Sequence, residues 1–131
     1  MNSISGKITN IDVDGALSLV HVDVNGQCIR SIIIDTPDTV DYLEEGREIN
    51  VVFKETEVIL ALKKDVTISL QNQFLGTVKE LTIRNLLSRV VIDSPLGPIT
   101  SIITSKAVES LKIKVESEVV AMVKTNEVML S

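Results

Sequence analysis

The sequence predicts an all-β protein of two tandem five-stranded barrels, each with one short helix. Three observations lead to this fold class: the chain repeats itself after 70 residues, apolar and polar residues alternate in short runs, and turn residues separate those runs. A length of 131 residues suits one ordinary domain or two very small ones. We expect a first unit at residues 1–65 and a second at residues 66–131.

The repeat is visible when residues 1–61 are aligned with residues 71–131 without a gap. The alignment gives 15 identities among 61 pairs. A β-rich composition produces apolar matches at any offset, but it does not keep Gly, Asn, Asp and Lys in step as well. Each copy is therefore expected to be one structural unit. The identical pairs are Asn2/Asn72, Gly6/Gly76, Leu17/Leu87, Ser18/Ser88, Val20/Val90, Asp23/Asp93, Ile29/Ile99, Ser31/Ser101, Ile32/Ile102, Ile33/Ile103, Glu48/Glu118, Lys54/Lys124, Glu57/Glu127, Val58/Val128 and Leu60/Leu130.

Each copy contains a series of predicted strands. Val20, Val22 and Val24 alternate with polar residues, which is the two-residue period of a half-buried strand. Asn25-Gly26 then suits a type I′ hairpin turn, whereas the second copy turns through residues 94–97 (Ser-Pro-Leu-Gly). The other strands of the first copy are expected at residues 29–34, 48–54 and 57–62, and those of the second copy at residues 99–104, 118–124 and 127–130. In each copy the last two strands are expected to close the unit.

One short helix is expected in each copy, at residues 37–43 and at residues 106–111. Pro37 suits a first helical position, with Thr36 as its cap. Five strands and one helix are the content of a small, partly open Greek-key barrel of the OB type. A unit of this size has little core, so we expect the two copies to pack together and to form oligomers. Residues 62–71 connect the copies and are too apolar for a free linker.

Composition excludes several classes of function. The formal net charge of −5 argues against electrostatic binding to nucleic acid, and two Phe, one Tyr and no Trp leave few side chains for base stacking. No apolar run has the length of a membrane span, and the N-terminus lacks the plan of a signal peptide. A single cysteine, Cys28, excludes an internal disulfide and favours a reducing cytoplasm. We expect no direct nucleic-acid partner and no membrane.

No catalytic constellation is visible in the sequence. His21 is the single histidine and lies on the polar side of a strand, which indicates an incidental surface residue. Asp23 and Asp93 belong to separate copies and have no neighbouring acid, so a structural role is expected for them. A nucleophile–base pair, a zinc ligand set, a Walker loop and a GxGxxG motif are all missing. The sequence therefore predicts a protein that is not an enzyme and that carries no covalent cofactor.

Small polar residues and one repeated lysine gather at predicted strand ends. Hydroxyls, amides and a lysine can replace the hydration shell of a compact oxyanion. The alternative is that Ser and Thr are simply good strand-edge residues. Charge favours the second copy as host, since residues 1–65 carry 6 basic and 12 acidic side chains and residues 66–131 carry 7 and 6. The residues in the second copy are Ser69, Gln71, Asn72, Ser101, Thr104, Ser105, Lys124 and Thr125.

Three stretches of the second copy resemble the tandem Mop-domain proteins, or molbindins, of the TOBE class. They are SLQNQFLGTVKEL at 69–81, ITSIITSKAVESLKI at 99–113 and VESEVVAMVKTNEVML at 115–130. The family pattern opens with Ser-x-Arg-Asn-Gln, continues with a Thr-x-x-Ser segment and ends around Lys-Ala-(Ser/Thr). The second copy follows all three in order, and the repeat extends the resemblance to nearly the whole chain.

The resemblance implies cytoplasmic binding of molybdate or tungstate for storage, homeostasis or sensing. In the family such sites lie at interfaces between modules or subunits, so a homo-oligomer (dimer or trimer) is implied, with the oxyanion as a non-covalent ligand. By position the oxyanion-binding residues would be Ser69, Gln71, Thr104, Lys124 and Thr125. Lys54 is the counterpart of Lys124 in the first copy. Asn72 belongs to the same set of residues, but a structural role is the favoured interpretation for it.

Several positions depart from the family pattern. Gln71 replaces the arginine and thereby removes a fixed charge and a bidentate fork, and Ala107 replaces the serine. In the first copy Met1, Ile34 and Pro37 stand at the arginine, threonine and serine positions. These departures predict fewer or weaker sites. They also leave open the alternative of a ligand-free TOBE-type interaction or regulatory domain, such as the effector half of a molybdate-responsive regulator or a partner of a transporter.

Overall fold

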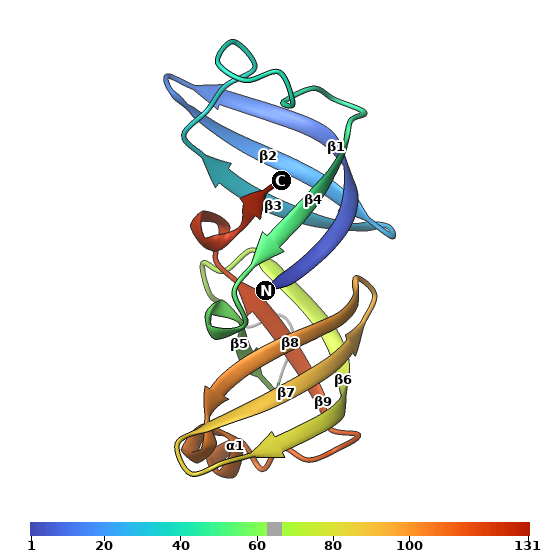
Figure 1. Ribbon diagram of the computed structural model, residues 1–131, viewed down its shortest axis with the longest axis vertical. Helices are drawn as coiled ribbons and strands as arrows, with labels where there is room; N and C mark the ends of the chain where they lie inside the picture. The colour runs from blue at the N-terminus through green and yellow to red at the C-terminus, as the bar shows by residue number, and fades with distance from the viewer. Residues whose placement is uncertain (63–66) are drawn as a thin grey trace.

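The chain folds into two five-stranded antiparallel sheets stacked along its long axis (Figure 1). The computed structural model describes residues 1–62 and 67–131. The strands are β1 (Asn2–Asp14), β2 (Leu17–Val24), β3 (Gln27–Ile33), β4 (Glu48–Phe53), β5 (Ile59–Ala61), β6 (Asn72–Ile83), β7 (Leu87–Ser94), β8 (Gly97–Thr104), β9 (Glu118–Val123) and β10 (Met129–Leu130). The helices are α1 (Ser105–Leu111) and the 3₁₀ turns η1 (Glu55–Glu57) and η2 (Thr125–Glu127).

Each sheet takes its edge strand from the other half of the chain. The strand orders are β10-β4-β1-β2-β3 and β5-β9-β6-β7-β8. The expectation that the last two strands close their own unit is therefore wrong, because the final strand of each copy joins the other sheet. Ile59 of β5 faces Met122 of β9, and Met129 of β10 faces Val52 of β4.

The two exchanged pairs are equivalent, because 59 and 129, like 52 and 122, differ by the repeat length of 70. The exchanged strands are similarly apolar and share Leu60/Leu130, so each sheet offers its guest strand similar apolar neighbours. Exchange of an identical element between similar units costs little. The sequence pattern consequently predicts the strands but not the half of the chain with which they pair.

The long first strand of each copy bends at the same place. The register slips between Ile8 and Asn10 in β1 and between Val78 and Glu80 in β6, which are β-bulges 70 residues apart. A bulge increases local bend and twist, and this lets one strand pair on both sides of a small barrel. Ahead of each bulge, Gly6 and Gly76 leave room for the neighbouring strand, since a Cβ at Gly76 would lie 2.7 Å from the carbonyl oxygen of Asp93.

The first hairpin turn and the second helix are confirmed. Asn25 and Gly26 have φ values of 50° and 84°, as a type I′ turn requires. Helix α1 occupies the expected place in the second copy, and its cap is Thr104, whose Oγ1 accepts a hydrogen bond of 3.1 Å from the N–H of Ala107.

The expected helix at residues 37–43 is wrong. The carbonyl of Thr36 accepts bonds from Thr39 and Val40, and this single turn does not continue. Thr36 is not a cap either, because its own N–H donates to Oγ1 of Thr39 at 2.8 Å. The β-branched and aspartate residues of this segment are weaker helix formers than the Ala, Glu and Leu of α1.

Reciprocal hydrogen bonds fasten the two halves together. The side chain of Asn72 bonds both the N–H and the C=O of Arg30 at 2.8 Å, and Asn2 makes the same two bonds to Thr100. Arg30 and Thr100 lie on β3 and β8, the outer strands of the two sheets. The amides therefore satisfy strand edges that would otherwise be open to pairing with other chains. A second pair joins Ser31 Oγ to the Val128 carbonyl and Ser101 Oγ to the Val58 carbonyl, at 2.6 and 2.9 Å.

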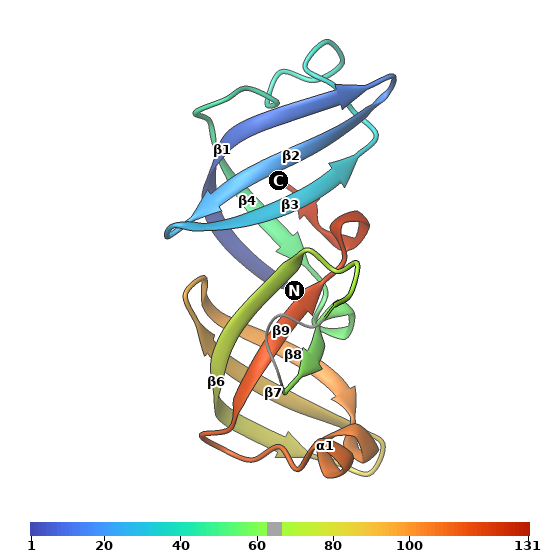
Figure 2. The ribbon, with the colours of Figure 1, turned by 180° about the vertical axis from the view of Figure 1, so that it is seen from behind.

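A single apolar cluster runs through both halves. Phe53 and Val58 of the first half and Phe74 and Ile99 of the second are all buried in it. The exchanged strands and the shared cluster make the two halves one packed body, as the view from behind also shows (Figure 2). Within the described residues, no helix is long and apolar enough to span a membrane.

Candidate functional site

The pairing of β6 with β9 brings three of the predicted residues together. Asn72 faces Val123, so Gln71 and Lys124, the next residues outward, lie opposite each other. Thr125 follows Lys124 as the first residue of η2. Gln71 and Lys124 are exposed and Thr125 is half-buried. We call Gln71, Lys124 and Thr125 the second-half cluster.

The backbone of Lys124 is hydrogen-bonded, and its side chain forms no ion pair with the described residues. The Lys124 carbonyl accepts a hydrogen bond of 2.9 Å from the N–H of Glu127, which closes η2. Lys124 has extended backbone angles, φ −71° and ψ 145°, and it forms no ion pair with any residue that the structure describes. An exposed, unpaired ammonium beside a hydroxyl and an amide can attract and hydrogen-bond an oxyanion.

The first half has an equivalent arrangement that already contains an anion. Asn2 faces Phe53, so Met1 lies opposite Lys54, and Glu55 stands where the second half has Thr125. Glu55 Oε1 lies 2.9 Å from the ammonium of Met1. That hydrogen bond is the largest cause of the lowered pKa of Glu55, and the charge of Arg89 also contributes. A carboxylate therefore occupies this half, and the sequence comparison of the two copies overlooked Glu55.

The other predicted residues lie apart from the second-half cluster or are already engaged. Asn72 is fully buried, and both polar atoms of its side chain are bonded to Arg30, as a structural role requires. Ser69 is exposed just before β6. Thr104 pairs with Leu87, near the opposite end of the second sheet from Gln71, and its hydroxyl caps α1.

Two of the small polar residues are structural. Ser101 is buried and donates to the Val58 carbonyl, and Ser105 bonds the hydroxyl of Ser88 at 2.8 Å. Arg30 is a candidate that sequence reasoning missed. The two hydrogen bonds from Asn72 hold the backbone of Arg30 next to the residue that follows Gln71, so a basic residue of the first half lies close in space to the start of β6. No signal within one copy could reveal it, because the contact is made between copies.

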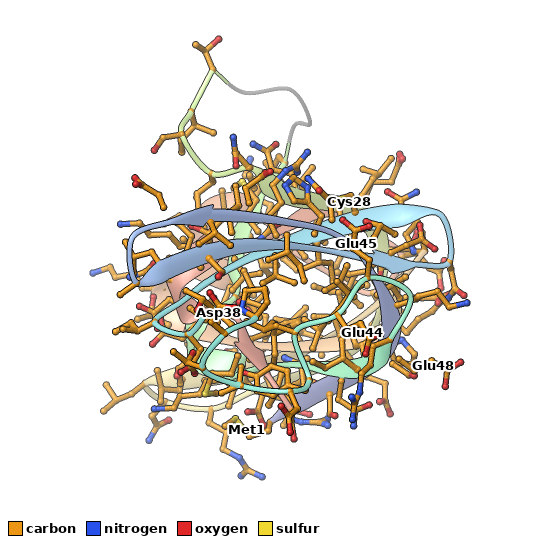
Figure 3. The ribbon with its side chains drawn as sticks, turned by 90° about the horizontal axis from the view of Figure 1, so that it is seen from above. Met1, Cys28, Asp38, Glu44, Glu45 and Glu48 are labelled. Atoms are coloured by element: carbon orange, nitrogen blue, oxygen red, sulfur yellow. The ribbon has the colours of Figure 1, made fainter. Side chains whose placement is uncertain are left out.

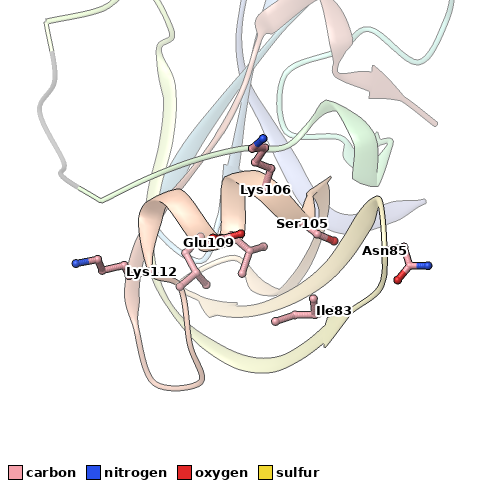
Figure 4. A pocket seen from close by; sticks show the side chains of 8 residues that line it. Ile83, Asn85, Ser105, Lys106, Glu109 and Lys112 are labelled. Atoms are coloured by element: carbon pink, nitrogen blue, oxygen red, sulfur yellow. The ribbon is translucent and has the colours of Figure 1, made fainter.

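A hollow lies elsewhere, beside α1 (Figure 4). Asn85, Ser105, Lys106, Glu109 and Lys112 line it together with apolar residues. Lys106 and Lys112 point away from each other, so their ammonium groups do not converge on one ligand (Figure 4). Of the small polar residues predicted from the sequence, Ser105 lines this hollow, whereas Gln71, Lys124 and Thr125 do not.

His21 is less isolated than the sequence indicates. Its Nε2 lies 3.3 Å from Oδ2 of Asp12, and its Nδ1 lies 3.7 Å from Sγ of Cys28. A thiol, an imidazole and a carboxylate in this order resemble a nucleophile, a base and an orienting acid. Neither His21 nor Cys28 lines any of five hollows on the described residues.

Comparison with known proteins identifies the fold and the family. Residues 68–130 match the TOBE domain family. The whole fold superposes with a TM-score of 0.90 on ModG, described as a cytoplasmic molybdate-binding protein and crystallised with molybdate, at 23% identity over 99% of this chain and 94% of that one. MopII from Clostridium pasteurianum, in an apo form, is 38% identical over 48% of this chain and 96% of its own length, with a TM-score of 0.46. No curated protein sequence matches the chain.

The superposition shows an OB-like, mostly β fold. Residues 68–130 belong to the TOBE domain family, as the resemblance of their opening signature predicted.

Proposed function

We propose that this chain binds molybdate or tungstate non-covalently, for storage, homeostasis or sensing in the cytoplasm. The observation that carries the proposal is the second-half cluster, where the strand register sets the exposed Lys124 opposite the exposed Gln71 and Thr125 follows it in the chain. Its relatives support the same ligand, since ModG is described as a molybdate-binding protein. The chemistry required is recognition without redox change, so the proposal is a binding protein and not an enzyme.

The two halves are proposed to be two Mop modules, residues 1–65 and 66–131, that exchange β5 and β10. They differ in one decisive group. Glu55 places a carboxylate beside Lys54, and an arriving dianion would be repelled by it. Thr125 at the equivalent position offers a hydroxyl donor and carries no charge. This difference supports the second half as the place where an oxyanion binds.

A single chain supplies only part of such a site. Thr104 lies away from the second-half cluster, so both can reach one small ligand only if a second chain provides one of them. We therefore propose binding at the interface between chains of a homo-oligomer, with Ser69 as a further contact. Arg30 is proposed to supply the positive charge that is lost where Gln71 replaces the family arginine.

The test is a thermal-shift titration with molybdate, tungstate, sulfate and phosphate. A ligand at about 100 times its Kd adds roughly 2.7 kcal/mol to the stability of the folded state. We expect molybdate or tungstate to raise the melting temperature and sulfate and phosphate to raise it less. No shift with any of the four anions at millimolar concentration would sink the proposal.

The second candidate function is a ligand-free interaction or regulatory domain with the same fold. The observation that favours it is the loss of two family groups, the arginine at Gln71 and the serine at Ala107. Its partner would be a regulator or a transporter subunit. The same titration separates the two candidates, because only the binding protein is stabilised by an oxyanion.

A further inference from the structure

The first hairpin turn contains an asparagine followed by a glycine. Asn25 is the single asparagine of the chain with glycine after it, since the other six are followed by Ser, Ile, Val, Gln, Leu and Glu. Asn25 and Gly26 are both exposed at the tip of the hairpin between β2 and β3. The backbone nitrogen after an asparagine lies within reach of its side-chain carbonyl carbon, and glycine offers that nitrogen without a side chain in the way. This pair is therefore set up for a reaction within the chain itself.

The turn leaves the Gly26 nitrogen open to react. Its N–H donates to no backbone acceptor among the described residues. Apart from its chain neighbours, no atom lies within 4 Å of the place where a Cβ would stand at Gly26. A succinimide ring between this nitrogen and the Asn25 side chain consequently has room to form.

The side-chain amide of Asn25 makes a contact between the two halves. Its Nδ2 donates a hydrogen bond of 3.2 Å to the carbonyl oxygen of Pro95, in the turn between β7 and β8. Pro95 is the counterpart of Asn25, 70 residues further along the chain, so equivalent turns of the two halves meet here. Both views of the ribbon show the tips of these two hairpins side by side (Figures 1 and 2).

We propose that Asn25 is a site of spontaneous deamidation and that the product loosens this contact. The Gly26 nitrogen loses its proton and bonds to Cγ of Asn25, and the Cγ–Nδ2 bond breaks so that Nδ2 leaves as ammonia. Water then opens the ring at either of its carbonyls, to give aspartate or isoaspartate. The co-reactant is water, one ammonia is released for each water consumed, and nothing is oxidised or reduced.

The reaction removes the atom that joins the two turns. Nδ2 is both the leaving group and the donor to Pro95, so the hydrogen bond is lost. A carboxylate has no proton to donate, and it repels the carbonyl oxygen that it faces. Isoaspartate also lengthens the backbone and thereby disturbs a tight turn whose φ angles are 50° and 84°.

The carboxylate that forms belongs to the acidic half of the chain. Residues 1–65 carry 6 basic and 12 acidic side chains. Four of the acidic ones, labelled in the view from above in Figure 3, are Asp38, Glu44, Glu45 and Glu48. Deamidation makes this half more negative, so anion exchange separates the product from the parent chain. The inference concerns the ageing of the chain and does not depend on the anion that the chain binds.

The test of the site is peptide mapping by mass spectrometry, on folded protein incubated at neutral and at mildly alkaline pH. Cleavage after Lys7 and Arg30 gives one peptide that holds both Asn25 and Asn10. Asn10 is the matched control, because it is exposed, its amide also donates a hydrogen bond, and isoleucine follows it. We expect deamidation at Asn25 to be about tenfold faster or more, since no Cβ shields the attacking nitrogen. The rate should rise with pH, because that nitrogen must lose its proton; equal rates at the two asparagines would overturn the proposed site.

Urea unfolding measures the consequence for the two halves. The aged protein, separated by anion exchange, and Asn25→Asp are both expected to unfold at a lower urea concentration than the fresh wild type. Asn85→Asp adds the same charge at an exposed position outside this contact and is expected to keep the wild-type midpoint. Asn25→Gln retains an amide that reacts far more slowly, so its midpoint should not fall during the incubation. An aged protein as stable as the fresh one, or an equal loss in Asn25→Asp and Asn85→Asp, would overturn the proposed effect on the contact.

Discussion

The replacement of Asn72 by alanine tests how the two halves are held together. Asn72 is fully buried, and its side chain makes two hydrogen bonds of 2.8 Å to the N–H and C=O of Arg30. The variant removes both bonds and leaves two backbone groups of an outer strand without partners. A buried polar group without its partner costs about 1–3 kcal/mol, so we expect a loss of about 2–4 kcal/mol in the free energy of unfolding.

The assay is urea unfolding followed by far-UV circular dichroism, because the chain has no tryptophan. The matched control is Asn10→Ala, since Asn10 is exposed and donates only to Oδ1 of its neighbour Asp12, at 3.3 Å. Surface changes of this kind stay within about 0.5 kcal/mol. Asn2→Ala should resemble Asn72→Ala, because Asn2 makes the reciprocal bonds to Thr100. If Asn72→Ala costs no more than Asn10→Ala, the account of the interface is wrong.

Three further predictions follow from the structure. Glu55→Thr removes the carboxylate from the first half, and isothermal titration calorimetry is expected to show more or tighter molybdate binding; unchanged binding would mean that Glu55 does not limit this half. Gly76→Ala places a Cβ 2.7 Å from the carbonyl oxygen of Asp93, so urea unfolding should show a loss of about 1–3 kcal/mol, and a neutral result would refute the close approach. The pKa of Tyr42 is raised above 10.0, first by burial and second by the negative charge of Asp35. Neutral Tyr42 therefore contributes stability that is fully present below pH 10, and this stability is lost as the pH rises through the folded-state pKa. Ultraviolet titration of this single tyrosine should give a midpoint above 10 that falls in urea and, by a smaller amount, in Asp35→Asn; equal midpoints in folded and unfolded protein would contradict it.

Sequence reasoning reached most of the strands because their signals are local. Alternation around Val22 and the Asn25-Gly26 turn depend on neighbouring residues, and the structure has both. The helix predicted from Pro37 fails because one good capping position does not compensate for poor helix formers behind it. The strand exchange could not be predicted, since β5 and β10 have the same apolar character and the outcome depends on contacts between distant segments.

The candidate site was predictable in part for the same reason. Lys124 and Thr125 lie side by side in one motif, and the register adds Gln71 from the strand that pairs with it. Arg30 and Glu55 could not be found by motif, because one enters from the other half and the other stands where the family has a hydroxyl. Arg30 was visible only once the two halves had been placed together, whereas Glu55 aligns with Thr125 at the offset of 70 residues and could have been noticed in the sequence.

The most direct test of the central claim is equilibrium dialysis against molybdate, with the bound metal measured by elemental analysis. The account predicts that the wild-type chain retains molybdate, that Lys124→Ala loses most of it, and that Lys54→Ala keeps it, because Lys54 already lies beside the carboxylate of Glu55. The two variants remove the same group from equivalent exposed positions, so each controls for the other. A wild-type chain that retains no molybdate, or an equal loss in the two variants, would contradict the account.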